Sequence, residues 1–565
     1  MGGTSLTPVA IAAFILFLGI LIFVHELGHF LAAKHFNIKV QKFSLGFGPP
    51  LFRFTRGDTT YQVALLPLGG YVKMLGDTPG EDISPEDKDR AFNTVPVHQR
   101  AIVAFAGPFM NLVFPVLCLF AYYTLGPTVI SPVIGQMEVD SPAEVGGLMS
   151  GDRVLSVDGE HVWDFDQMAK LVRARPQEPT KFEVERKGQT IALTVTPRSQ
   201  EGTDIFGDKE THGLIGVTPM RVGTRVGVDG PRGQALGFLT GDRVLKIGGK
   251  SVTKLVEVED ALAASAGQSV EVIVARPVGL ASGDLLLGKR ERPQALSMSI
   301  PAGAKTLADL DLASADAFFR YLEPEGPAAR AGIREGDRVV AIEGHRVAMF
   351  LSFVSALSQA ELKPVRVTVS RMGQRIDVVV KNEAKTVVHG ATMKERPYYD
   401  SGIGLGAVPR AFITSNWPIG GTTQTETAQL SLVEALQASA EQTVDLIGGI
   451  MQGFAKLFTG GVSLKTVGGP LMLFQVAAEA AEIGLGQYLR LLAFISVNLG
   501  IMNLIPIPLL DGGHLLFCAI EAIKRKPVSM RVRETATIVG LVLLAVLIVV
   551  AFSNDVARFT DGFLN

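Results

Sequence analysis

The amino-terminal apolar segment constrains the fold most, because it combines a membrane-crossing length with an HExxH pattern. Between residues 6 and 33 the only ionisable side chains are His25, Glu26 and His29. Residues i and i+4 share one helix face, so the two histidines could hold one Zn²⁺ with Glu26 beside the metal-bound water. Charges inside a bilayer are costly and are usually functional. We therefore predict metal-dependent hydrolysis within a membrane; the alternative is a helix whose polar groups only hydrogen-bond to neighbouring helices.

A second apolar region, near the other end of the chain, is interrupted at residues 503–514 (NLIPIPLLDGGH) by two prolines and two glycines. Such a break is tolerated at membrane depth only where the backbone lines a cavity or is buried in protein. Asp511 lies at this break and is expected to face a polar partner. Two histidines and one carboxylate, with a fourth position open, form a catalytic zinc site. We therefore expect Asp511 to be the third metal ligand.

Composition and hydropathy indicate a chain of several domains that is partly embedded in a membrane. The 565 residues exceed one domain, 47% of them are hydrophobic, and the mean hydropathy is +0.30. The net charge of −2 gives no indication of nucleic-acid binding. Cys118 and Cys518 fall in apolar spans and are expected to pack there, not to form a disulfide. Four membrane spans are expected, at residues 6–33, 101–125, 488–520 and 536–552.

The distribution of basic residues predicts an orientation in the membrane. The loop after the first span contains Lys34, Lys39, Lys42, Arg53 and Arg56, and the loop after the third contains Lys524, Arg525, Lys526, Arg531 and Arg533, whereas the amino terminus has no lysine or arginine. By the positive-inside rule, both loops are cytoplasmic. Both termini and the large central region are then expected outside the cytoplasm. A cleaved signal peptide is the alternative for the first span, which is long, lacks a basic start and carries the HExxH.

The central region contains a repeat. A Gly-Asp-Arg-Val signature recurs at residues 151–154, 241–244 and 336–339. Each copy is followed by a turn and a helical pattern (residues 165–174, 256–264 and 351–360), and alternating strands follow at residues 182–195 and 365–380. The pattern resembles tandem PDZ domains, expected at residues 129–200, 211–302 and 314–383, with the second the weaker match. PDZ domains bind a peptide carboxyl terminus by strand addition; the alternative is that they are spacers.

The motifs together resemble the site-2 protease family of intramembrane metalloproteases, in the bacterial branch that includes the regulator of sigma-E protease. HELGH and NLIPIPLLDGGH carry the resemblance, with further matches at residues 43–49, 67–74, 107–111 and 467–470. It implies Zn²⁺ bound by His25, His29 and Asp511, with Glu26 as general base. It assigns no metal to His35 or His514. The third PDZ-like copy departs from the usual two of this branch.

The family resemblance also implies substrates, partners and location. The expected substrates are single-span membrane proteins already trimmed outside the membrane, such as anti-sigma factors and remnant signal peptides, cleaved in the bacterial inner membrane among its lipids. Asn503 matches a position that hydrogen-bonds the substrate backbone, although an Asn at a helix break could instead cap it. Two other classes compete with this interpretation: an inactive membrane-anchored PDZ scaffold, and a transporter, for which broken helices are also expected.

The segment between the first two spans, residues 39–75, predicts short β segments punctuated by glycine and proline. In the family, similar sequences form a membrane-associated β-hairpin whose edge can pair with an unwound substrate. The expected substrate-binding residues are Gly46, Phe47, Gly48, Gly69 and Gly70. The alternative is a surface loop.

The fold class follows from these elements: a polytopic α-helical membrane protein of about four transmembrane helices, with a β-hairpin and inserted tandem PDZ domains. Residues 1–125 hold the first two spans and residues 486–565 hold the last two. Helices at residues 429–485 are expected to couple the inserted domains to the membrane. Apolar residues at helical spacing within this segment suggest a helix lying on the membrane surface or packed into a core: Ile447, Ile450, Met451, Phe454, Leu457 and Phe458.

Overall fold

The computed structural model divides the chain into two compact units. Met1–Pro127 and Gln429–Asn565 form the membrane unit, and Thr128–Gly390 and Lys394–Ala428 form the central unit. The structure describes residues 7–564 except for several short segments: 79–80, 82, 139, 205, 207, 278–290, 320–321, 348–352, 354–355, 358–359, 389–394, 404–421 and 527. The helix expected at residues 351–360 lies mostly outside the described residues.

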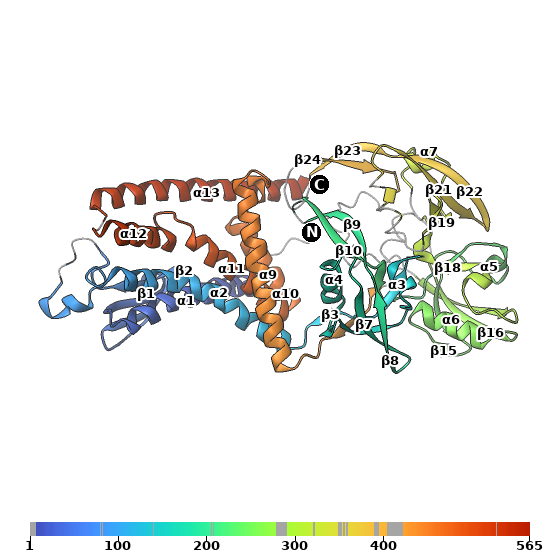
Figure 1. Ribbon diagram of the computed structural model, residues 1–565, viewed down its shortest axis with the longest axis horizontal. Coiled ribbons are helices and arrows are strands. Elements are labelled where there is room, and N and C mark those ends of the chain that lie inside the picture. Colours follow the sequence, from blue (N-terminus) through green and yellow to red (C-terminus); the bar gives the residue numbers. More distant parts are fainter. Residues whose placement is uncertain are drawn as a thin grey trace. The chain divides into compact units, whose positions relative to one another are not determined.

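Among the described residues, four helices of the membrane unit are long and apolar enough to cross a membrane (Figure 1): α1 (Pro8–His35), α2 (Val97–Thr124), α11 (Leu485–Leu504) and α13 (Met530–Leu564). The expected polytopic fold is therefore confirmed. The third span ends at Leu504, because the prolines that follow break the helix, and α12 (Asp511–Lys524) begins a new one. α1 starts where Thr7 accepts a hydrogen bond from the Ala10 amide and Pro8 occupies the first turn.

Helix α2 is the centre of the membrane unit, because it packs against α1, α11, α12 and α9 (Leu432–Phe458). A core of buried side chains from α1, α2, α10 (Pro470–Ile483) and α11 closes this bundle, including Phe17, Leu21, Leu119 and Leu492. α9 begins at a capping box of Ser431 and Glu434 and buries small side chains, whereas Met451 and Phe458 are exposed. One side of α9 thus packs on the bundle, whereas Met451 and Phe458 do not pack in the protein core.

The amino terminus of α10 is held by the last helix of the chain. The Asp555 carboxylate on α13 accepts hydrogen bonds from the backbone amides of Gly469, Leu471 and Met472, at 2.9, 3.0 and 3.2 Å. Asp555 is 2% exposed. A β-carbon at Gly469 would approach Asp555 Oδ2 to 2.6 Å, so this motif glycine permits the contact. A carboxylate from a helix distant in the sequence thus caps the N-terminus of α10.

The β-hairpin of the membrane unit consists of β1 (Val40–Arg56) and β2 (Thr59–Met74) and is folded on itself. Residues 40–45 lie between two neighbours: they pair with residues 70–74 on one side and align with residues 60–63 on the other. Residues 60–63 pair in addition with residues 52–56. The expected hairpin is confirmed. Its exposed side chains near the turn are large and apolar, which suits contact with lipid: Leu51, Phe52, Phe54, Leu65 and Leu66.

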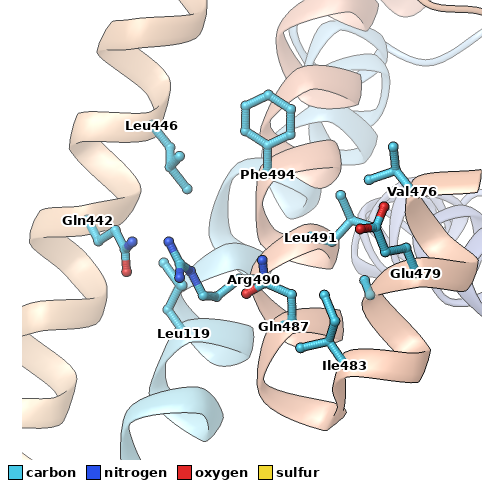
Figure 2. Close-up of a pocket in the computed structure, with 11 residues that line it drawn as sticks. Leu119, Gln442, Leu446, Val476, Glu479, Ile483, Gln487, Arg490, Leu491 and Phe494 are labelled. Atoms are coloured by element: carbon cyan, nitrogen blue, oxygen red, sulfur yellow. The ribbon is translucent and has the colours of Figure 1, made fainter. Parts of the chain in front are cut away.

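A cavity of about 380 Å³ lies among α2, α9, α10 and α11 (Figure 2). Its lining is mostly apolar, with polar groups from Gln442, Glu479, Gln487 and Arg490. The Arg490 guanidinium lies 5.6 Å from the centre of the Tyr122 ring. No residue of the HExxH or of the 503–514 segment lines this cavity.

The central unit contains three similar four-stranded antiparallel sheets. The first has the order β6-β5-β7-β8, the second β15-β14-β16-β17 and the third β20-β19-β21-β22. Their strands are β5 (Arg153–Val157), β6 (Glu160–His161), β7 (Thr180–Arg186), β8 (Gln189–Val195), β14 (Arg243–Ile247), β15 (Lys250–Ser251), β16 (Ser269–Pro277), β17 (Glu291–Ser299), β19 (Arg338–Ile342), β20 (His345–Arg346), β21 (Pro364–Arg371) and β22 (Gln374–Lys381). α4 (Phe165–Arg173) and α6 (Leu255–Ala264) follow the short hairpins of the first two sheets.

Short helices and strands complete each sheet unit: α3 (Pro142–Val145), α5 (Pro231–Ala235), α7 (Pro327–Arg330), β4 (Ile134–Met137), β9 (Arg198–Thr203), β10 (Lys209–Leu214), β11 (Val217–Pro219), β13 (Val226–Val228), β18 (Leu312–Ser314), β23 (Glu383–Val388) and β24 (Glu395–Asp400). The first hydrophobic core includes Ile215, and β11 pairs with β4. The first unit therefore extends beyond the expected end at residue 200, because its last strand returns to its first.

One ion pair repeats in all three sheet units and explains the Gly-Asp-Arg-Val signature. Asp152 is 1% exposed and accepts two hydrogen bonds of 2.7 Å from the Arg186 guanidinium, which also donates to the Gly147 carbonyl. The same contacts recur at Asp242 with Arg276 and at Asp337 with Arg371. This Asp–Arg clamp raises the pKa of Arg186 through its hydrogen bond with Asp152. The signature aspartate is thus a structural residue.

The two ends of the central unit are joined. β26 (Thr425–Thr427) pairs with β3 (Thr128–Ile130), and β25 (Thr422–Thr423) pairs with β12 (Arg221–Val222). Glu426 accepts hydrogen bonds from Arg153, at 2.8 Å between Nη1 and Oε2, and from Ser131. Burial alone would raise the pKa of Glu426, but these hydrogen bonds bring it below its usual value. The chain therefore enters and leaves the central unit at one place.

Candidate metal centre

Three potential metal ligands from the two ends of the chain meet in the membrane unit. His25 and His29 lie one turn apart near the end of α1, and Asp511 is the first residue of α12. His25 Nε2 lies 3.2 Å from Asp511 Oδ2, His29 Nε2 lies 3.4 Å from Asp511 Oδ1, and the two Nε2 atoms are 3.2 Å apart. Among the described residues, these three form the only group of its kind.

The spacing of these atoms fits zinc. Zn–N and Zn–O bonds of about 2.0–2.1 Å at tetrahedral angles place two ligand atoms about 3.3–3.4 Å apart. The three measured separations are 3.2, 3.2 and 3.4 Å. Three protein ligands also leave a fourth position open, as in catalytic sites.

The partners of Asp511 support the same conclusion. Its side chain is 18% exposed, and within the part of the chain that the structure describes its ion-pair contacts are with the two imidazoles. A divalent cation bound between the two imidazoles and the carboxylate would compensate the negative charge of Asp511.

Asp511 reaches the site because the backbone around it is tightly folded. α11 ends at Leu504, and the loop returns so that Gly512 lies directly against the Leu504 and Ile505 carbonyls, where a side chain would collide. Gly513 approaches the Ile507 carbonyl in the same way. The two glycines after Asp511 therefore allow the start of α12 to pack against the break.

α2 supplies the surroundings of both imidazoles. The His29 Nδ1 atom lies 2.8 Å from the Val103 carbonyl, which can only accept, so Nδ1 carries the proton and Nε2 is free for a metal. Gly107, one turn further on, touches both rings, and any β-carbon there would collide with His29. Asn111, after another turn, places Nδ2 3.2 Å from His25 Nδ1. The rings are thus fixed by one face of α2.

The β-hairpin passes directly beside Glu26. A β-carbon at Gly70 would lie 3.0 Å from Glu26 Cγ and 2.9 Å from the Ser44 carbonyl, so only a glycine allows β2 this close to α1. Phe47 stacks on Tyr71 with ring centres 6.0 Å apart, and it is 45% exposed. The structure therefore brings the hairpin and the candidate general base together.

Comparison with known proteins identifies the family. Residues 13–547 match the model of peptidase family M50. The chain belongs to peptidase family M50. The match includes both halves of the metal centre.

Three relatives extend over nearly the whole M50 chain. They are the protease RseP of Yersinia pestis, 30% identical over 550 residues, the regulator of sigma-E protease RseP of Salmonella typhimurium (strain 14028s), 30% over 549, and that of Escherichia coli K12, 29% over 551. Each alignment covers 97% of this chain and 98% of the relative. The M50 chain is therefore an intramembrane zinc metalloprotease and a multi-pass membrane protein.

The other residues predicted from the sequence lie outside the group of His25, His29 and Asp511. Asn503 is half-buried in the last turn of α11. Gly46 and Gly48 lie in β1 with φ near +90°, a region that favours glycine. His35 ends α1, and His514 lies in the first turn of α12; neither belongs to the metal-ligand group.

Sequence reasoning missed the part that α2 plays around the metal ligands. The Gly-Pro-Phe-Met-Asn motif was matched to the family, but no role was assigned to Gly107 or Asn111. The spacing of Val103, Gly107 and Asn111 at four-residue intervals places them on one helix face, which is a detectable pattern. The contact of the Val103 carbonyl could not be predicted from the sequence, because every residue has a backbone carbonyl.

Proposed function

We propose that this protease cleaves transmembrane segments of single-span membrane proteins after they have been trimmed outside the membrane, of the anti-sigma factor or remnant signal peptide type. His25, His29 and Asp511 would hold the Zn²⁺, and Glu26 would be the general base. The observation that carries the proposal is the close approach of three side chains beside a hairpin strand: each imidazole Nε2 lies 3.2–3.4 Å from an Asp511 carboxylate oxygen, and the two Nε2 atoms are 3.2 Å apart.

The chemistry divides between the metal and the protein. Bound zinc would supply a Lewis acid that activates water and polarises the scissile carbonyl. Glu26 precedes Leu27 and Gly28 on the turn between the two histidines, so its carboxylate lies beside the ligand group. It would accept the proton of the attacking water and return it to the leaving nitrogen. The apolar surroundings strengthen each of these electrostatic effects.

Substrate presentation would use the edge of the hairpin. A transmembrane helix satisfies its amides internally, so cleavage requires local unwinding, and the exposed amides then need new partners. Residues 70–74 pair with β1 on one side, at the edge of the folded hairpin and next to Glu26. We propose that Gly46, Phe47, Gly48, Gly69 and Gly70 contact the unwound segment and that Asn503 hydrogen-bonds its backbone.

The three sheet units of the central unit are proposed as PDZ domains that recognise or exclude substrates by their extracytoplasmic part. Each has a four-stranded antiparallel sheet, and a helix follows the short hairpin in the first two. Lysines and arginines that follow α1 and those around the connection between α12 and α13 support cytoplasmic loops, with both termini and the central unit outside. Helices α9 and α10 would couple the central unit to the catalytic core.

The variant Glu26→Gln tests the catalytic proposal. The amide cannot take a proton, so cleavage of a reconstituted single-span substrate should fall about 10³-fold. Zinc content, measured by mass spectrometry of the purified protein, should remain at one equivalent because the ligands are intact. Glu482→Gln, at an exposed position of α10, is the matched control and should cleave normally. Wild-type cleavage by the zinc-loaded Glu26→Gln protein would refute the role of Glu26.

A further inference from the structure

The Asn111 side chain is buried and incompletely hydrogen-bonded beside the proposed metal ligand His25. Asn111 is 0% exposed, and its Oδ1 atom has no hydrogen-bond partner among the described residues. Its Nδ2 atom lies 3.2 Å from His25 Nδ1. A buried amide oxygen without a partner is costly and requires a reason.

The two ends of the amide suit two tautomers of His25. With Nδ2 facing the ring, the amide donates to a bare Nδ1, and the ring proton then resides on Nε2, where it blocks metal binding. With the amide in the opposite orientation, Oδ1 occupies the position 3.2 Å from Nδ1 and accepts a hydrogen bond from Nδ1–H, which leaves the Nε2 lone pair available. Amide oxygen and nitrogen are assigned from such hydrogen-bond requirements.

We infer that Asn111 is the positioning residue that selects the metal-binding tautomer of His25, because its Oδ1 accepts a hydrogen bond from the His25 Nδ1–H group. The arrangement at His29 supports this, because its Nδ1 already faces the Val103 carbonyl at 2.8 Å, two turns earlier on the same helix face. Both imidazoles then receive an acceptor from α2. Metal-bound histidines almost always have such a partner, which fixes the ring and raises its basicity.

A neighbouring helix holds the backbone of Asn111 in place through a contact that does not involve the side-chain amide. The Ser496 hydroxyl on α11 donates to the Asn111 backbone carbonyl at 2.8 Å, and both residues are fully buried. Gly107, between Val103 and Asn111, lets α2 lie close enough for both contacts. The inference assigns a function to the Gly-Pro-Phe-Met-Asn motif: it brings an acceptor within reach of the first histidine of HExxH.

The inference rests on the proposed ligand set, which a separate variant tests. In the purified full-length protein, His25→Ala should abolish stoichiometric zinc binding. If it does not, the ligand set is wrong, whatever Asn111 does. If it does, the Asn111 variants can be interpreted on their own.

The test compares Asn111→Leu, which keeps the approximate volume but removes the acceptor, with Asn111→Asp, which keeps an acceptor in either orientation. Zinc dissociation constants are measured in detergent by competition with a chromogenic chelator. Asn111→Leu should bind zinc about 10–100-fold more weakly. Asn111→Asp should stay within a few-fold of wild type. Co²⁺ absorption spectra of both loaded proteins add a readout of ligand geometry, which should change for Asn111→Leu only.

Ser496→Ala is the matched control, because it perturbs the same buried contact between α2 and α11 without touching the amide. It should leave zinc affinity within about twofold. Far-ultraviolet circular dichroism of the zinc-free proteins establishes that each variant is folded. Wild-type zinc affinity in a folded Asn111→Leu protein would overturn the inference. An equal loss in Asn111→Leu and Asn111→Asp would also overturn it, since the acceptor would then be irrelevant.

Discussion

In the central unit, Asp152, Asp242 and Asp337 are almost fully buried, and each is clamped by an arginine thirty-four residues later. In the membrane unit, Asp511 also has restricted exposure, yet its described ion-pair contacts are with His25 and His29. The difference separates two uses of a carboxylate. Where the chain places an arginine beside the carboxylate, the residue maintains the fold, and where it places two imidazoles there, the arrangement suits the binding of a cation.

The largest effect that would test this comparison is expected at Asp511. Asp511→Asn removes the negative ligand, so zinc content should fall below about a tenth of an equivalent, and cleavage should be undetectable. Zinc-free Asp511→Asn should be at least as stable as the zinc-free wild type, because an uncompensated carboxylate has been removed. Metal analysis and thermal unfolding without zinc provide the two readings. A strongly destabilised but zinc-loaded variant would make Asp511 a structural residue and erase the distinction.

Removal of an arginine of the Asp–Arg clamp should have the opposite effects: the central unit should lose stability, and zinc content should not change. Arg186→Ala leaves Asp152 buried without its partner, which should cost about 3 kcal/mol of central-unit stability while zinc content stays normal. Urea unfolding followed by Trp163 fluorescence, in a Trp417→Phe background, measures this cost. Arg276→Ala and Arg371→Ala are parallel tests in the second and third units. Loss of zinc from any of these variants would contradict the separation of roles.

A smaller effect is expected at Asp555, a third kind of buried carboxylate, whose partners are backbone amides. Asp555→Ala should destabilise the first turn of α10 by about 1 kcal/mol, which corresponds to several-fold faster hydrogen exchange of its amides. Exchange measured by mass spectrometry on a peptide containing Leu471 and Met472 gives the reading. Asp555→Asn keeps an acceptor oxygen and should recover part of the protection. Unchanged exchange in the alanine variant would mean that α13 does not cap α10.

The smallest effect concerns pH and a less deeply buried counterpart of the clamp, the pair of Arg153 and Glu426. The pKa of Glu426 is lowered in the folded protein, so the pair contributes stability above the ordinary glutamate pKa of about 4.3, and this contribution disappears as the pH falls through the lower folded value. The free energy of unfolding, measured by urea denaturation, should be up to about 1 kcal/mol greater for wild type than for Glu426→Gln at pH 7. The two values should converge near pH 3. If the difference in the free energy of unfolding grew as the pH fell, the ion pair would not be the source of the stability.

The same contrast explains what could be predicted from sequence. Repeats and hydropathy predicted the spans and the three sheets, because periodicity is carried by many residues. The carboxylate at residue 511 was found because its proline-rich surroundings are unusual in an apolar segment. The boundary at residue 200 was too early, because the return of residues 217–219 to β4 is a long-range pairing. The Asp–Arg clamp could have been inferred, since the arginine recurs at a constant distance in all three repeats.

The wide separation of the proposed ligands along the chain has a consequence for biosynthesis. The two imidazoles are synthesised before the central unit, whereas the carboxylate that completes the proposed set follows only after the whole central unit has been made. A nascent polypeptide therefore carries an incomplete centre for most of its synthesis. A chain that stops before residue 511 would lack the third proposed ligand and, on the proposed mechanism, would not cleave other membrane proteins.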